Sequence, residues 1–176
     1  MKKILAVALF SAISIPALAG ESGAFVALDA QNWSTTNNAP LGNPSMGLRI
    51  GGGYHFTRNI GVEVDYAKSG DTASYLGAKY NVSSVQAAAV GTYPINDMFD
   101  VYAKLGVASN KISLTGPGAI CNSCSKTDLM YGVGGQYNVN KQIGIRLEYV
   151  PLGKASNTGT YDLGVSTLSA GVIYNF

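Results

Sequence analysis

The sequence predicts an all-β protein, an eight-stranded antiparallel up-and-down transmembrane β-barrel. Three observations lead to this prediction: apolar residues recur at every second position, one hairpin pattern occurs three times, and tight turns alternate with longer connections. The composition agrees, because the chain has 22 glycines and 11 tyrosines and only 12% of its residues are charged.

The first 19 residues have the features of a cleaved secretory signal peptide. Lys2 and Lys3 precede a short apolar run, and Ala17-Leu18-Ala19 forms a small-x-small cleavage site. We expect residues 20–176 to form one outer-membrane barrel domain. No later apolar run reaches about 18 residues, the length of a transmembrane helix. Without the two lysines, 10 basic residues remain against 10 acidic ones, which gives no reason to expect a nucleic-acid partner.

The elements follow one another in a regular order. The first strand is expected over Gly23–Gln31, and Trp33 ends it. Ser34–Ser45 is rich in Asn, Thr, Gly and Pro, which predicts a loop. Alternation resumes over Met46–Phe56 and continues over Ile60–Tyr66.

In the repeated hairpin pattern, a tyrosine precedes a tight turn and an apolar ladder of period two follows it. The three turns are Thr57–Asn59, Asn96–Met98 and Asn140–Gln142. The longer connections of the opposite end are Ala67–Ala73, Ser109–Lys126 and Lys154–Thr160. About eight strands of roughly ten residues result, the number in the smallest transmembrane barrels.

Charged residues lie at mid-strand, on the face opposite the apolar ladders. They are Arg49, Glu63, Asp65, Lys104, Arg146 and Glu148. An arginine facing lipid at the bilayer midplane costs roughly 2–4 kcal/mol, so in a membrane barrel these residues must lie inside and pair. A soluble barrel of lipocalin type is the alternative, although its usual Gly-x-Trp is missing from the first strand.

Aromatic residues are expected to form a girdle at each membrane interface. The short-turn girdle would contain Tyr54, Phe56, Tyr93, Phe99, Tyr137 and Phe176, and the long-loop girdle Trp33, Tyr66, Tyr75, Tyr149 and Tyr161. In the last strand the lipid-facing residues would be Leu168, Ala170, Val172, Tyr174 and Phe176. This strand should pair with the first strand and close the barrel.

The sequence resembles the transmembrane domain of the OmpA family of bacterial outer-membrane proteins over nearly all of the expected mature chain. The resemblance is most specific at Gly53-Tyr54 with Ile60–Glu63, at Tyr93–Ile95 with Asp100–Gly106, and at Ile143–Tyr149. It implies that Tyr174 and Phe176 form the signal that the outer-membrane assembly machinery reads.

The resemblance also implies an interior ion-pair cluster, to which Glu63 and Arg146 correspond. Val90 and Gln136 stand where the family usually carries a lysine and a second glutamate. A simpler Glu63–Arg146 pair is therefore expected. Larger members continue into a peptidoglycan-binding domain, which we expect this chain, ending at Phe176, to lack.

The sequence shows no convincing catalytic, cofactor or metal site. His55 has Thr57 nearby but no Ser/Asp constellation, so a structural role is expected. Gly51–Gly53 and Gly132–Gly135 lack the helix and lysine of a phosphate-binding loop, which predicts space-saving or bending roles in strands. In an oxidising compartment Cys121 and Cys124 are expected to form a disulfide that shapes their loop.

Three functions remain open. The first is a non-enzymatic barrel that supports envelope integrity and presents surface loops. The second is a narrow ion-conducting pore through the polar interior, and the third is an adhesin acting through Ser34–Ser45 and Ser109–Lys126. The expected partners are outer-membrane lipid, lipopolysaccharide and the barrel assembly machinery, and a monomer is expected.

Overall fold

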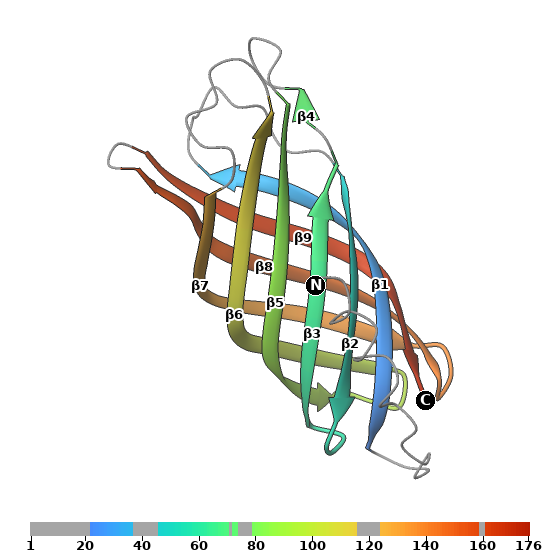
Figure 1. The fold of residues 1–176 in the computed structure, drawn as a ribbon. Helices are drawn as coiled ribbons and strands as arrows, with labels where there is room; N and C mark the ends of the chain where they lie inside the picture. Colours follow the sequence, from blue (N-terminus) through green and yellow to red (C-terminus); the bar gives the residue numbers. More distant parts are fainter. Residues whose placement is uncertain (1–21, 37–45, 71, 74–78, 116–123, 159–160) are drawn as a thin grey trace, which may run out of the picture.

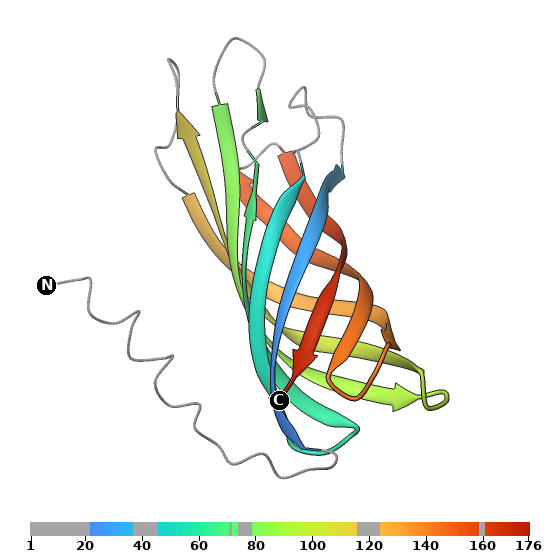
Figure 2. The same ribbon diagram turned by 90° about the vertical axis from the view of Figure 1, so that its right-hand side faces the viewer.

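The computed structural model describes residues 22–36, 46–70, 72–73, 79–115, 124–158 and 161–176, and these form a closed antiparallel β-barrel (Figures 1 and 2). The strands are β1 Gly23–Thr36, β2 Gly47–His55, β3 Ile60–Ser69, β4 Thr72–Ala73, β5 Lys79–Pro94, β6 Phe99–Thr115, β7 Cys124–Asn138, β8 Ile143–Thr158 and β9 Tyr161–Asn175. Eight long strands form the wall, and β4 is a two-residue addition on β5. The predicted fold class is confirmed.

The barrel closes between its first and last strands, as expected. β1 pairs with β9 from Phe25 opposite Asn175 to Thr36 opposite Gly164. The Phe176 amide extends this junction by donating a hydrogen bond to the Ala24 carbonyl at 3.0 Å. Each other long strand pairs with the next long strand along the chain, and β3 pairs directly with β5.

The three tight turns share one hydrogen-bond pattern. Thr57, Asn96 and Asn140 occupy equivalent positions, and each side-chain oxygen accepts the backbone N–H groups two and three residues later, at 2.7–3.2 Å. This local satisfaction of backbone donors explains why Thr and Asn occur there. The repeat seen in the sequence is therefore a repeat of turn chemistry.

The outer wall is apolar in the way that the inverted polarity predicts. Valine, leucine, isoleucine and tyrosine side chains are exposed all round it, and in β9 the exposed residues are Leu168, Ala170, Val172 and Tyr174. Phe56, Tyr93, Phe99, Tyr137 and Phe176 are exposed towards the short-turn end. In the part of the chain that the structure describes, no helix is long and apolar enough to cross a membrane.

The prediction for Trp33 is wrong. We expected it in the long-loop girdle, but its side chain is 0% exposed inside the barrel. The reason is that β1 continues to Thr36, so Trp33 keeps the inward phase of Asp29 and Gln31. Tyr66 and Tyr149 are exposed as expected, whereas Tyr75 and the side chain of Tyr161 lie outside the described residues.

The longer connections are shorter than predicted. β3 runs to Ser69, β6 to Thr115 and β8 to Thr158, so strand pairing continues into segments that we assigned to loops. These extensions are rich in Ser, Asn, Lys and Thr. In β6 the outward-facing apolar residues end at Val107, and Ile112 and Leu114 fall in the opposite phase. The period-two signal of a lipid-facing wall therefore ends before the strand ends.

One junction in the wall is only partly paired through its backbone. The ladder between β7 and β8 runs from Val133 opposite Tyr149 to Asn138 opposite Gly144. Beyond Val133, β7 continues along β6 while β8 continues with β9, and the strands diverge towards the loop end (Figures 1 and 2). Buried Met130, Val150 and Leu152 lie in this part of β7 and β8.

Candidate functional site

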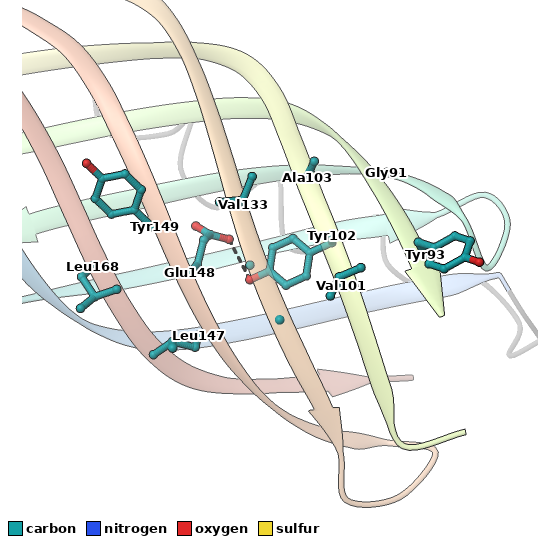
Figure 3. A pocket seen from close by; sticks show the side chains of 12 residues that line it. Gly91, Tyr93, Val101, Tyr102, Ala103, Val133, Leu147, Glu148, Tyr149 and Leu168 are labelled. Atoms are coloured by element: carbon teal, nitrogen blue, oxygen red, sulfur yellow. Dashed lines mark hydrogen bonds between the residues drawn. The ribbon is translucent and has the colours of Figure 1, made fainter. Parts of the chain in front are cut away.

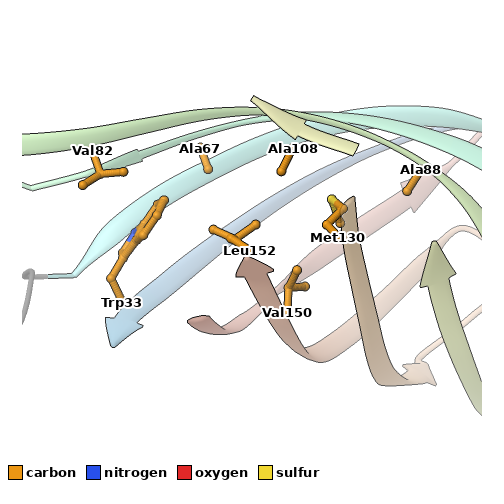
Figure 4. Close-up of a cluster of buried hydrophobic side chains, with 8 residues drawn as sticks. All are labelled: Trp33, Ala67, Val82, Ala88, Ala108, Met130, Val150 and Leu152. Atoms are coloured by element: carbon orange, nitrogen blue, oxygen red, sulfur yellow. The ribbon is translucent and has the colours of Figure 1, made fainter. Parts of the chain in front are cut away.

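The barrel interior contains apolar groups towards both ends and a charged group between them. Phe25, Ala27 and Ile173 form a small buried cluster near the short-turn end. The larger cluster extends towards the loop end and comprises Trp33, Ala67, Val82, Ala88, Ala108, Met130, Val150 and Leu152 (Figure 4). The side chains of this larger cluster come from six strands, β1, β3, β5, β6, β7 and β8, and most of them lie between the charged group and the loop end.

Two arginines, Arg49 and Arg146, share the carboxylate of Asp29 at the centre of the charged group. Arg146 donates from Nε to Asp29 Oδ1 at 2.8 Å and from Nη2 to Oδ2 at 2.7 Å, a bidentate pair. Arg49 donates from Nε to Asp29 Oδ2 at 2.9 Å and from Nη1 to Glu148. Arg146 Nη1 also donates to Glu63 Oε1 at 2.8 Å. The strongest hydrogen-bond geometry thus centres on one carboxylate.

Lys104 joins the remaining acids from the opposite wall. Its Nζ lies 2.7 Å from Glu63 Oε2, 2.6 Å from Glu148 Oε2 and 4.0 Å from Asp65 Oδ2. The Tyr102 hydroxyl donates to Glu148 Oε2 at 3.0 Å. Because each of these charged side chains is at most 2% exposed, the ionic network is shielded from water and salt. It links β1, β2, β3, β6 and β8 across the lumen.

Glycines provide the room for this network. A Cβ at Gly51 would collide with the Asp65 carboxylate, one at Gly134 with the Tyr102 ring, and one at Gly171 with Asp29. Each glycine is the cross-strand partner of the large residue that it accommodates. The predicted space-saving role of Gly51 and Gly134 is confirmed.

The network is unbalanced in formal charge. Among the described interior residues, Asp29, Glu63, Asp65 and Glu148 face three cations, Arg49, Lys104 and Arg146. Asp65 has the longest contact, and no donor among the described residues reaches its Oδ1. Asp65 is therefore the least compensated acid of the network.

The structure places all six predicted charged residues in the buried interior and adds Asp29, which the sequence reasoning missed. The sequence did contain a signal for an interior Asp29, because Asp29 lies two and four residues after Ala27 and Phe25, on the same face of the strand. The expected Glu63–Arg146 pair is present at 2.8 Å, but the expectation that it stands alone is wrong, since Glu63 also pairs with Lys104 and Arg146 with Asp29. Lys104, the cross-strand partner of Val90, contributes the third base of the network.

The other candidate residues lie apart from the network. His55 stacks on Phe25 with ring centroids 4.6 Å apart. Tyr174 and Phe176 are exposed at the end of the last strand, with ring centroids 5.1 Å apart. Cys121 lies outside the described residues, so its pairing with Cys124 stays a prediction.

A closed antiparallel barrel with an apolar outer wall and an ion-paired interior defines a small integral β-barrel protein of the outer membrane. The chain belongs to the outer membrane protein beta-barrel domain family, whose model matches residues 5–176. It is OmpA-like, as the sequence resemblance indicated.

The curated relatives are outer membrane protein A of several enteric bacteria. The Shigella flexneri protein is 30% identical over 151 residues, which cover 80% of this chain and 43% of that protein. The Klebsiella pneumoniae protein is 32% identical over 159 residues, covering 82% and 45%. This chain therefore spans less than half the length of the curated relatives it matches.

Solved structures share the fold at lower identity. Neisserial surface protein A superposes with a TM-score of 0.71 at 22% identity, covering 89% of this chain and 99% of that chain. The N-terminal barrel of Pseudomonas aeruginosa OprF gives 0.61 at 15% identity, covering 89% and 100%. These likenesses concern the fold alone.

Proposed function

We propose that this protein is a non-catalytic structural barrel of the outer membrane that does not conduct ions in its resting state. The observation that carries the proposal is the cross-linked interior, in which Lys104 bridges Glu63 and Glu148 and Arg146 bridges Asp29 and Glu63. Interior side chains therefore tie together strands on opposite sides of the wall. Such links would support a rigid barrel in the envelope.

The same arrangement opposes a permanent pore. An eight-stranded barrel has an interior just wide enough for its own side chains. An ion crossing this lumen would have to separate Lys104 from two carboxylates and pass Trp33, Met130 and Leu152 in the apolar cluster. Breaking a buried ion pair leaves an uncompensated charge, which costs about 3–5 kcal/mol.

Cellular context completes the proposal. Export would use the cleaved segment 1–19, and the assembly machinery would read Tyr174 and Phe176. The barrel would be a monomer surrounded by phospholipid and lipopolysaccharide. Cys121 and Cys124 would form a disulfide in a surface connection. The adhesin alternative depends on Ser34–Ser45 and Ser109–Lys126, of which 37–45 and 116–123 lie outside the described residues.

Planar-bilayer recording of folded protein tests the closed interior. Wild type should give no discrete conductance steps, because the ion network fills the lumen. Lys104→Met tests the network directly, and Leu105→Met on the lipid-facing side of the same strand is the matched control. Reproducible steps from wild type that change with Lys104→Met and not with Leu105→Met would support the pore function instead.

A further inference from the structure

A hollow of about 550 Å³ lies in the outer wall where β5, β6, β7 and β8 run side by side (Figure 3). Its outward-facing floor is made of Gly91, Ala103 and Gly135. Tyr93, Leu147 and Tyr149 rise around it. A small-residue patch is thus set among large apolar and aromatic side chains.

Cross-strand register makes the floor continuous. Gly91 is the direct partner of Ala103 on β6. Ala103 is opposite Val133, and Val101 is opposite Gly135, so the small residues of β6 and β7 are diagonal neighbours on one face. Diagonal neighbours on an antiparallel sheet lie roughly 7–8 Å apart. The floor of the hollow, hereafter the groove, therefore continues across three strands.

The two floor glycines are not required by packing within the barrel. A Cβ at Gly91 would meet nothing within 4 Å, and one at Gly135 would come no closer than 3.9 Å to the Asp100 carbonyl. Gly134, Gly106 and Gly171 differ, because a Cβ at each would collide with a neighbouring strand. Glycine in a strand interior costs roughly 0.5–1 kcal/mol relative to alanine. In the described barrel, no close internal contact requires glycine at Gly91 or Gly135, so packing within the barrel does not offset this cost.

The position of the groove determines the chemistry that can fill it. The groove lies on the membrane-facing wall. Glu148 is the one charged residue in its lining, and its buried side chain is paired with Arg49 and Lys104 in the barrel interior, so the outward side of the groove is apolar. An occupant must therefore be apolar along most of its length. The volume falls within the roughly 300–1,000 Å³ that is usual for small-molecule sites.

The polar end of the occupant is expected at the short-turn interface. Tyr93, at the end of β5, is 70% exposed and lies beside the turn that follows Pro94. Tyrosines at this level place their ring in the apolar region and their hydroxyl among the headgroups. Outer-membrane barrels keep their short turns on the periplasmic side, so this end faces the periplasmic leaflet.

We propose that the groove binds one acyl chain of a glycerophospholipid from the periplasmic leaflet. The chain lies over Gly91, Ala103 and Gly135, between Leu147 and Tyr149, and the Tyr93 hydroxyl contacts the ester or headgroup region. The bilayer already covers this wall, and a groove without protein side chains is filled by the component that surrounds it. This proposal requires the barrel to be in a membrane and is independent of whether it conducts.

Fluorescence quenching by brominated phosphatidylcholine in phosphatidylcholine vesicles tests the proposal. A tryptophan replaces Leu147 at the groove or Ile50 on β2, each in the Trp33→Phe background. The native side chains at these positions are 57% and 58% exposed, so the two reporters are matched. We expect the relative association constant of a phospholipid to be at least threefold higher at Leu147→Trp, and Gly91→Leu should remove the difference.

Native mass spectrometry of protein with its own Trp33 provides a second measurement. Wild type should retain one phospholipid on release from detergent, and Gly91→Leu/Gly135→Leu should retain it at least fivefold less. Ala30→Leu, which enlarges an exposed alanine on β1, should behave as wild type. Equal constants at the two reporters, or equal retention by all three proteins, overturns the proposal. Protection of Leu147→Trp from the brominated lipid by a second copy of the chain overturns it as well.

Discussion

Replacing Lys104 by methionine should be among the most damaging single changes inside the barrel. Lys104 Nζ lies 2.7 Å from Glu63 and 2.6 Å from Glu148, and its side chain is 1% exposed. Methionine retains most of the volume but removes the charge. The described network would then hold four acids against two bases. Removing one partner of a buried ion pair costs about 3–5 kcal/mol, and this lysine serves two acids.

Urea unfolding of the barrel in lipid vesicles, followed by heat-modifiable gel mobility, measures the loss. We expect Lys104→Met to lower the free energy of unfolding by about 3–5 kcal/mol. Leu105→Met, a lipid-facing change one residue away, should alter it by less than about 0.5 kcal/mol. Lys104→Met combined with Glu63→Gln should cost less than the sum of the two single changes, because the pair removes one charge of each sign.

Two results would refute this reasoning. One is a loss below about 1 kcal/mol for Lys104→Met, the size expected for an exposed ion pair. The other is strict additivity of Lys104→Met and Glu63→Gln, which would mean that the two side chains do not interact. Either result would also weaken the structural role proposed for the network.

Further predictions concern the charge balance of the interior, the glycines that accommodate large side chains, the tight turns, and assembly into the membrane. Asp65→Asn should preserve or raise the free energy of unfolding, because it removes the least compensated charge, whereas Glu63→Gln should lower it by about 3 kcal/mol; the same urea assay compares them. Gly134→Ala should cost about 1–3 kcal/mol because its Cβ meets Tyr102, while Gly135→Ala should fold as wild type, and equal losses would contradict the glycine assignment. Asn140→Ala removes the acceptor of two turn N–H groups and should cost about 1–2 kcal/mol, measured against Lys141→Ala in the same turn. Deleting Phe176 should reduce the heat-modifiable form in outer-membrane fractions more than it lowers the stability of refolded protein; a normal yield in the membrane would argue against an assembly signal.

The overall barrel could be predicted from the sequence because a bilayer imposes a strict rule on each strand. Leu48 and Ile50 alternate with Arg49, and Val62 and Val64 alternate with Glu63, which leaves one orientation possible in lipid. The positions of the tight turns could also be predicted, since Asn96 and Asn140 occur at equivalent positions of two repeats of the hairpin pattern. The alternation of polarity along each strand and the turn residues were therefore enough to predict the number of strands, which face of each strand meets lipid, and the pairing of the first strand with the last.

The partners inside the barrel could not be predicted in the same way. That Lys104 lies opposite Val90 depends on register between β5 and β6, which is not a local property of either strand. Trp33 was misplaced because its polar neighbours concealed the continuation of β1. Asp29 was visible on the inward face, but its central role requires Arg49 and Arg146 to come from two other strands.

The partly paired junction between β7 and β8 makes the two ends of the barrel mechanically unequal. At the short-turn end the two strands are joined by a covalent turn and by a ladder that reaches from Asn138 to Val133. Beyond Val133 the backbone ladder ends, and buried side chains of the two strands, such as Met130 and Val150, belong to the same apolar cluster. Any parting of the wall here would pivot about the turn at Asn140, so the periplasmic mouth would stay shut while the outer half of the wall widened sideways into the surrounding leaflet.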